Sequence, residues 1–416
     1  RQEGRGSNGS RQRSRLRHVL VIGELALSLV LMVAAGLLLR SFWDLFRVQP
    51  GFNPTRVTAI ETTLPNPNDP KTDIYHTATQ EAVLLHEVLR RNRTIPGVEE
   101  TAVSDRAALP LGHGQNDLRQ RPLIREGQEE RSNQPPLIDT SIVSPEYFHV
   151  LGMILLRGRL FADRDLEDTP SIAVINQAAA RTYWPNQDPV GKRVIVRSRF
   201  AKPGWTTIVG VIADARTESL SDAGIPQMYF DIYQRPAKFL ALYLRGQVDP
   251  AAILAQVRKQ VQAVDPELPV FHAETLNDVL SSSLSVRRFS MEMVTLFAGT
   301  ALLLAGLGIY GTISFLVNEQ SREIAIRLAL GAQRSNILRM VLRQGITLAG
   351  AGAGVGLVGA LVVSHLMAGL LYGVSPYDLS IFAGVTAVLT AVAIAASYVP
   401  ALRAMRLDPI TTLHAE

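Results

Sequence analysis

The stretch VTLFAGTALLLAGLGIYGTISFLV, residues Val294–Val317, decides the fold of this chain. It carries no charged side chain and is long enough to cross a hydrocarbon core of about 30 Å as a helix. Three other runs have at least 20 residues and at most one ionisable side chain each: Val19–Leu39, Gly345–Leu371 and Leu379–Leu402. The first run is separated from the other three by Ser41–Arg288, which has the composition of a globular domain. The sequence therefore predicts a membrane protein with four transmembrane α-helices in a one-plus-three order.

The distribution of arginine predicts the orientation. Arginines precede the first run, fill the connection between the second and third runs, and follow the fourth run, whereas Tyr372–Asp378 has no basic residue. Under the positive-inside rule, both termini and the loop at 318–343 are cytoplasmic, and the large block lies outside a bacterial inner (plasma) membrane. That block holds 28 Lys+Arg and 29 Asp+Glu, so the net charge of +5 reflects topology. We therefore expect no nucleic-acid partner.

The runs divide the chain into nine predicted segments. They are a basic cytoplasmic tail or linker at 1–17, helices at 18–40, 289–317, 344–371 and 379–402, an extracytoplasmic domain at 41–288, a cytoplasmic loop at 318–343, an external turn at 372–378 and a cytoplasmic tail at 403–416. The chain has no cysteine, so the external domain is expected to be held by its core and not by disulfides.

The external block alternates strand and helix patterns. Two β-α-β units are predicted from strand propensity, helical spacing and Pro-Gly or Asp-Pro stops, at residues 57–103 and 239–272. Between them lies a long insertion with short strand candidates at Ile172–Ile175, Arg193–Val196 and Thr207–Ile212, and a helix at Gln177–Trp184 that Pro185 ends. The prediction is a large α+β domain, in which one β-α-β lobe receives a second, inserted lobe.

The predicted cytoplasmic loop contains a short amphipathic helix. Glu323–Leu330 favours helix, Gly331 is expected to end it, and Ser335 is expected to cap the next helix. Apolar Ile324 and Leu328 lie on one side of this helix. On sequence chemistry alone two interpretations stay open: a helix that lies on anionic membrane lipid, or a coupling helix that fits a groove on a cytoplasmic motor.

Several short motifs give no function of their own. The sequences GLGIYG (Gly306–Gly311) and GVGLVG (Gly354–Gly359) match a dinucleotide-binding pattern, but both lie inside apolar runs. Gly306, Gly350 and Gly354, with the pair Gly352/Gly356, are better interpreted as small-residue faces for helix packing. No nucleotide-binding loop, catalytic elbow or metal-ligand spacing is present, so we expect no catalytic residue, metal or cofactor.

Five longer strings carry a family resemblance. They are ELALSLVLMVAAGLLLRS (Glu24–Ser41), YFHVLGMILLRGRLF (Tyr147–Phe161), IVGVIADAR (Ile208–Arg216), SREIAIRLALGA (Ser321–Ala332) and PALRAMRLDPITTL (Pro400–Leu413). In this order, from Arg15 onward, the chain resembles the MacB/FtsX family of ABC-transporter permeases. It looks most similar to the second half of a duplicated permease, which would account for a first residue that is not Met.

The resemblance implies a mechanism and a set of partners. It implies a permease subunit that works as a dimer or pseudo-dimer with separate cytoplasmic ATP-binding subunits, so this chain itself would be no enzyme. A porter-like external domain, with a periplasmic adaptor as a further partner, would use the transmitted motion for efflux or substrate release. Residues matched to the family's coupling helix would contact the ATPase: Arg322, Glu323, Ile324, Arg327, Leu328, Gly331 and Ala332.

Two other classes of function compete with this one. A membrane-anchored regulator would control a cell-envelope partner through its external domain without transport. A membrane-bound hydrolase would need a catalytic constellation in the external block, and none is apparent. An ATPase that binds the chain separates the permease from the hydrolase, and a periplasmic adaptor separates efflux from regulation.

Overall fold

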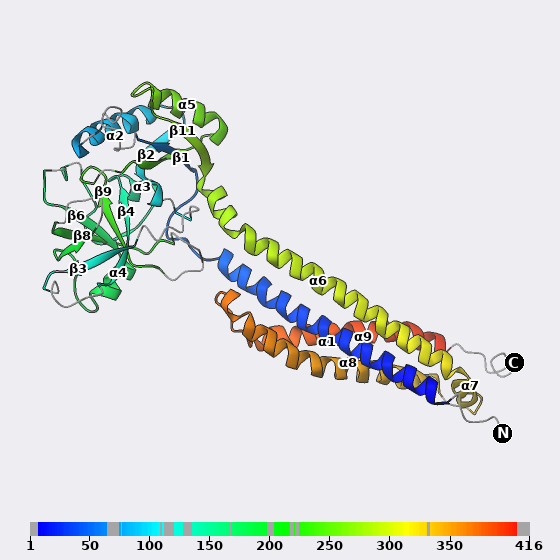
Figure 1. The fold of residues 1–416 in the computed structure, drawn as a ribbon. Helices are drawn as coiled ribbons and strands as arrows, with labels where there is room; N and C mark the ends of the chain where they lie inside the picture. The colour runs from blue at the N-terminus through cyan, green and yellow to red at the C-terminus, as the bar shows by residue number, and fades with distance from the viewer. Residues whose placement is uncertain are drawn as a thin grey trace. The chain divides into compact units, whose positions relative to one another are not determined.

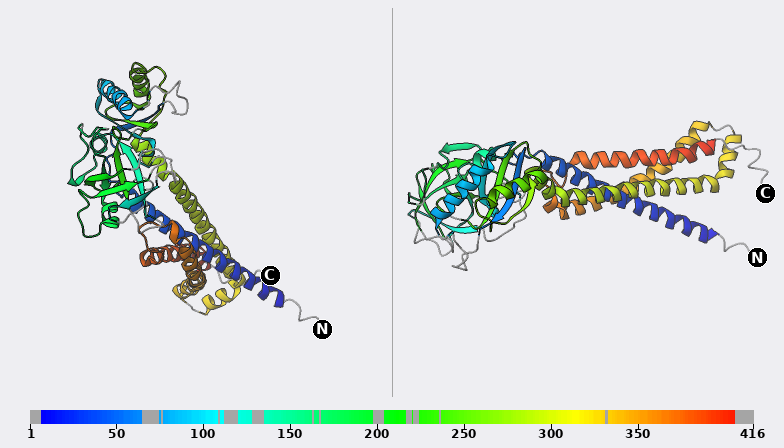
Figure 2. Two further views of the ribbon diagram at one scale, coloured as in Figure 1. Left: turned by 60° about the vertical axis from the view of Figure 1, so that its left-hand side comes forward. Right: turned by 90° about the horizontal axis from the view of Figure 1, so that it is seen from above.

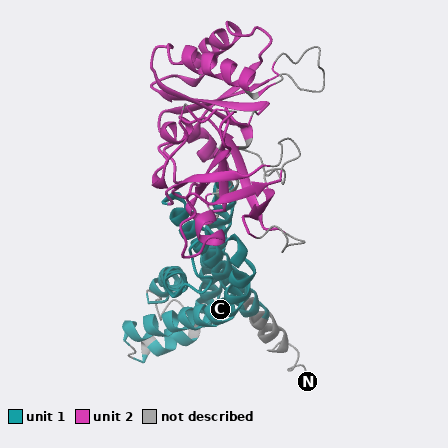
Figure 3. Cartoon of the chain, turned by 90° about the vertical axis from the view of Figure 1, so that its left-hand side faces the viewer, with its two compact units in different colours: residues 1–47, 286–416 teal, residues 48–285 magenta. Residues whose placement is uncertain are grey.

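The computed structural model describes the chain except residues 1–6, 65–74, 76, 109, 112–119, 128–134, 163, 167, 198–203, 217–219, 221–223, 236, 331–332 and 406–416. It forms two compact units, coloured separately in Figure 3. One unit contains residues 1–47 and 286–416, and the other contains residues 48–285.

The first unit is a bundle of long helices. The helices α1 (Ser7–Phe46), α6 (Leu276–Glu319), α8 (Arg334–Leu366) and α9 (Leu379–Met405) each contain a stretch long and apolar enough to cross a membrane. Figures 1 and 2 show these helices from three sides. A short helix, α7 (Ser321–Ala329), connects α6 to α8, and a turn with a single 3-10 helix, η2 (Ala368–Leu370), precedes α9. The prediction of four membrane helices in a one-plus-three order is confirmed.

Small residues allow α1, α8 and α9 to pack closely. A Cβ added to Gly352 of α8 would lie 2.5 Å from the Cβ of Leu25 in α1, and one added to Gly356 would lie 3.0 Å from the Cα of Ala26. Between apolar helices in lipid, such close approach supplies the van der Waals contact that holds a bundle together. Ser28 adds a polar contact, because its hydroxyl donates to the Ala301 carbonyl of α6 at 2.8 Å.

The first lobe of the second unit is a four-stranded antiparallel sheet in the order β11-β1-β10-β2. Its strands are β1 (Val57–Thr63), β2 (Val98–Asp105), β10 (Phe239–Gly246) and β11 (Val270–Thr275). The helices α2 (Ala78–Asn92) and α5 (Pro250–Gln262) pack on one face of it (Figure 1). The two predicted β-α-β units are confirmed, but each is split: β10 lies between β1 and β2, and β1 lies between β10 and β11.

The inserted lobe is a closed ring of six strands. The path β4-β3-β7-β8-β6-β9 closes because β9 also pairs with β4, in parallel. Its strands are β3 (Gln120–Arg125), β4 (Leu137–Val143), β6 (Ile172–Asn176), β7 (Arg193–Val196), β8 (Thr206–Ile212) and β9 (Gln227–Asp231). A further strand, β5 (Leu155–Gly158), pairs with β8, and the helix α4 (Gln177–Tyr183) follows β6. The sequence predicted β6, β7, β8 and α4, but missed β3, β4, β5 and β9.

A buried aromatic cluster joins the two lobes. Tyr147 and Phe148 of the short helix α3 (Tyr147–Val150) have no solvent-exposed surface. The Tyr147 ring lies 5.4 Å from that of Tyr243 in β10, and the Phe148 ring lies 5.4 Å from that of Tyr229 in β9, both edge to face. Because β10 belongs to the first lobe and β9 to the second, this cluster packs the lobes against each other.

Candidate coupling site

Helix α7 begins almost where α6 ends. Gln320 is the only residue between them, and the hydrogen bonds on each side of it continue without a break. The Gln320 amide donates to the Leu316 carbonyl, and the Ile324 amide donates to the Gln320 carbonyl, both at 2.9 Å. The position of α7 is therefore set directly by the end of a membrane-spanning helix and not by a loop.

The inner face of α7 is buried in the helix bundle. Ile324 is 1% exposed and Ala325 is fully buried. Ile324 belongs to the same hydrophobic cluster as Ile337 and Val341 of α8. This burial fixes the helix against the bundle, so Ile324 is not available to a partner in this conformation.

Two exposed apolar residues lie beside an ion pair, one on the outer face of α7 and the other directly after its last residue. Ile326 and Leu330 are 44% and 83% exposed. Glu323 and Arg327 form an ion pair one turn apart, and Arg327 also reaches the sulfur of Met340 in α8 at 3.2 Å. Protein-binding surfaces commonly have an apolar centre flanked by charged groups, as this one does.

The remaining predicted contact residues are described only in part. The side chains of Arg322 and Leu328, and the whole of Gly331 and Ala332, lie outside the described residues. Ser335 does not cap α8, contrary to our prediction. Helix α8 already begins at Arg334, the residue before Ser335. Its N-cap residue is Gln333, whose side chain makes no capping hydrogen bond.

The predicted packing glycines lie on different faces of the bundle. Gly306 of α6 faces α9, since its added Cβ would lie 3.3 Å from Cγ1 of Val392. Gly350 and Gly354 have no described atom within 4 Å of an added Cβ, so they face away from the contact that Gly352 makes. A packing role for Gly350 and Gly354 stays a prediction.

A polar network fixes α1 to the segment that begins α9. Arg40 donates to Asp378 at 2.6 Å and to the Ser380 hydroxyl at 3.0 Å, and the Ser41 hydroxyl accepts from the Tyr372 amide at 2.7 Å. The hydrogen bond from the Ser380 hydroxyl, helped by backbone amides and Arg40, holds the pKa of the Asp378 carboxyl below its usual range. This network joins the C-terminal end of α1 to the N-terminal end of α9. Helix α7, in contrast, lies between the C-terminal end of α6 and the N-terminal end of α8.

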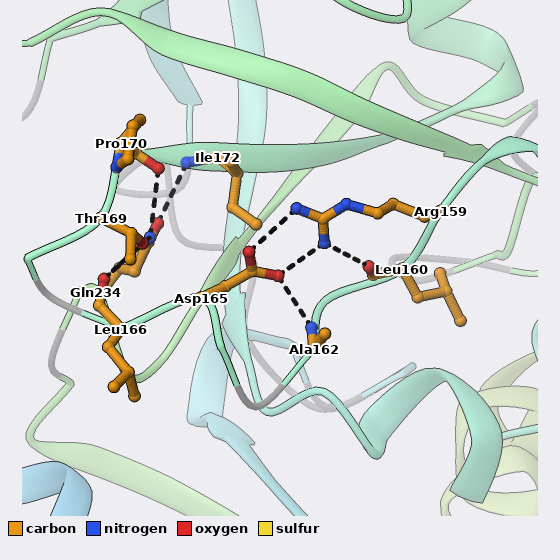
Figure 4. Close-up of polar contacts among 9 residues, drawn as sticks. All are labelled: Arg159, Leu160, Ala162, Asp165, Leu166, Thr169, Pro170, Ile172 and Gln234. Carbon is orange, nitrogen blue, oxygen red and sulfur yellow. Dashed lines mark hydrogen bonds and ion pairs between the residues drawn. The ribbon is translucent and has the colours of Figure 1, made fainter.

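Residues 163–168 are rich in acidic side chains, and Asp165 among them forms an ion pair with Arg159. Arg159 donates from two nitrogens to Asp165, at 2.6 and 2.9 Å, and the Ala162 amide donates to the same carboxylate at 2.9 Å (Figure 4). Burial opposes ionisation, but these hydrogen bonds keep the pKa of Asp165 below its usual range. Among the described residues no group of three or more acidic or histidine side chains could hold a metal ion.

Two known domain families account for most of the chain. Residues 19–264 match the MacB-like periplasmic core domain, and residues 295–409 match the FtsX-like permease C-terminal domain. The first match alone covers more than half of the sequence. The chain belongs to the MacB/FtsX family of ABC-transporter permeases.

The individual relatives share limited sequence identity with this chain, and they are longer than it. The macrolide export ATP-binding/permease protein MacB of Mannheimia succiniciproducens is 25% identical over 288 residues, which are 66% of this chain and 43% of the relative. MacB 2 of Aeromonas hydrophila is 27% identical over 289 residues, with the same shares. The crystal structure of the periplasmic region of MacB from Actinobacillus actinomycetemcomitans overlaps 57% of this chain and 97% of its own, at 12% identity and a TM-score of 0.36. The chain spans less than half the length of these curated relatives.

Proposed function

We propose that this chain is the membrane subunit that transmits the motion of a separate cytoplasmic ATP-binding subunit to the unit at residues 48–285, for efflux or substrate release. In this proposal both termini and α7 are cytoplasmic, and the unit at 48–285 lies outside the inner membrane. The arginine distribution supports this orientation. The family supports the ABC-transporter class, and the chain would leave ATP hydrolysis to its partner.

The division of α7 into two faces carries the proposal. Ile324 and Ala325 fix the helix in the bundle, while Ile326 and Leu330 remain exposed next to the Glu323–Arg327 ion pair. A helix that transmits motion must be attached to the spans on one side and to the motor on the other, and α7 has both surfaces. A lipid-bound helix would also expose apolar residues, so binding to a protein must be tested directly.

The proposal also concerns assembly. A permease of this class would work as a dimer or pseudo-dimer, with one ATP-binding subunit beneath each α7 and a periplasmic adaptor on the outer unit. The exposed glycines Gly350 and Gly354 supply one small-residue face on which a second permease could pack.

The test is purification of the full-length protein from its host in mild detergent, with Leu330→Glu and Arg327→Glu as variants. Arg339→Glu is the matched control, because it makes the same charge reversal at an exposed arginine of α8. We expect an ATPase with a nucleotide-binding loop to co-purify with the wild type and the control. Retention should fall about tenfold or more in both α7 variants, since truncation or reversal at the centre of an interface costs about 2 kcal/mol.

Two outcomes would contradict the proposal. Equal retention of the ATPase by all variants would remove α7 from the interface. A stable complex with an external partner and no ATPase would favour the membrane-anchored regulator.

A further inference from the structure

The nine residues that follow α1 form a segment held at both of its ends, which we name the strap (Val48–Arg56). At its start, the Pro50 carbonyl accepts a hydrogen bond from the Arg216 amide at 2.8 Å. Gly51 has a φ of +81°, and an added Cβ would overlap the carbonyl of Asp214. Both contacts are made with the chain that leaves β8. The start of the strap is therefore bound to the second lobe.

The end of the strap is bound to the first lobe by one arginine. Arg245 of β10 donates from Nη2 to the Asn53 carbonyl and from Nη1 to the Thr55 carbonyl, both at 3.3 Å. Its Nε donates to the Val150 carbonyl, at the end of α3, at 2.8 Å. A planar guanidinium can satisfy several carbonyls at once, which a lysine ammonium does less well.

Backbone hydrogen bonds reinforce the same attachment. The Asn53 amide donates to the Leu151 carbonyl at 2.7 Å, and the Gly246 amide donates to the Arg56 carbonyl at 2.9 Å. Phe52, which precedes Asn53, is 6% exposed. A nine-residue connection with these contacts is not a flexible linker, which would have its backbone in water.

We propose that the strap is a clamp that joins the two lobes, and that Arg245 is the positioning residue that locks it. The strap is bound to the second lobe at Pro50 and Gly51 and to the first lobe through Arg245, and the lobes share a buried aromatic cluster. The two lobes therefore move together and do not open relative to each other.

The experiment is hydrogen exchange of the full-length protein in detergent, measured by mass spectrometry. Arg245→Met removes the donors and keeps most of the side-chain length. Arg258→Met is the matched control, because Arg258 donates to a backbone carbonyl of β11, at Val270, at 3.1 Å, in the same lobe. We expect Arg245→Met to speed exchange of the Asn53 amide about tenfold, while amides of β6 in the second lobe keep their wild-type rates.

A second measurement tests the lock without relying on exchange rates. The chain has no cysteine, so two introduced cysteines at exposed positions, Gln49 of the strap and Gln256 of α5 in the first lobe, can carry spin labels specifically. We expect a narrow distance distribution in the wild type, a broad one with Arg245→Met, and partial recovery with Arg245→Lys. An equally narrow distribution in all three proteins, or unchanged exchange at Asn53, would overturn the inference. Neither measurement involves an ATPase, so its failure is distinguishable from failure of the proposed function.

Discussion

The contact between α1 and α8 yields a prediction whose magnitude follows from geometry. In Gly352→Ala, the new Cβ would lie 2.5 Å from the Cβ of Leu25, and real Cβ atoms do not approach so closely. The neighbouring atom is itself next to the backbone, so no side-chain rotation relieves the overlap and the helices must separate. Overpacking of this kind costs about 1–3 kcal/mol.

Two residues away, Gly350→Ala provides the control. No described atom lies within 4 Å of its added Cβ, and the gain in helix propensity, about 1 kcal/mol, is the same for both substitutions. The difference between the two variants therefore isolates the packing cost, and Gly352→Ala should unfold about 1–3 kcal/mol more easily. The assay is an SDS titration of the full-length protein in mixed micelles, followed by circular dichroism. Equal midpoints for the two variants would refute the close α1–α8 contact. A loss of stability in Gly350→Ala alone would place that glycine in a contact with a second chain.

Three further predictions concern polar contacts. Asp165→Asn should destabilise the unit at 48–285 by about 2 kcal/mol in denaturant, because hydrogen bonds to a charged group are lost. The pKa of Asp165 is lowered by folding, so the stabilisation is present above the unfolded pKa of about 4 and is lost as pH falls through the folded pKa. The wild type should therefore lose more stability in that acidic range than the Asn variant, which keeps the other carboxylates of the unit. Ser28→Ala should weaken the bundle by about 0.6 kcal/mol in SDS titrations, whereas Ser364→Ala, whose hydroxyl bonds only within its own helix, should have less effect. Asp378→Ala should lower stability in the same titration more than Arg40→Ala does, since the aspartate also accepts from an amide at the start of α9.

The membrane helices could be predicted from sequence because their signal is local. Val294–Val317 needs no knowledge of its neighbours to be identified as a span, since length and lack of charge are sufficient. The first lobe was predictable for a similar reason: β1 and β10 are apolar and rich in strand formers, and each precedes a helix with clear start or stop signals.

The second lobe was only partly predictable because its strands depend on distant partners. Strand β3, with the sequence QRPLIR, contains a proline and three polar or charged residues, and no periodicity identifies it. Strand β9 has five buried residues, including Gln227 and Asp231, so alternation of polar and apolar residues is absent. Both become strands by closing a ring with β4, a pairing that no local pattern specifies.

The helix of the candidate coupling site could be predicted from the sequence, but its buried and exposed faces could not. Ile324 and Leu328 are one turn apart, and so are Ile326 and Leu330, so the sequence offers two apolar stripes and cannot tell which one faces the bundle. The structure buries Ile324 and exposes Ile326 and Leu330. The exposed stripe was missed because the choice depends on where α8 passes, which is a tertiary property.

The two connections of the unit at 48–285 to α1 and α6 have one property in common. The strap enters the unit after α1, and α6 leaves it directly from β11, where the Thr275 hydroxyl accepts from the Asp278 amide at 3.1 Å and starts the helix without a linker. A flexible linker at either point would take up a displacement as a change in its own conformation. Within the unit at 48–285 both connections are hydrogen-bonded to folded elements, so neither is a free linker at the point where the chain enters or leaves that unit. This local attachment supports the proposal of a subunit that transmits motion, whether the motion serves efflux, substrate release or control of an envelope partner.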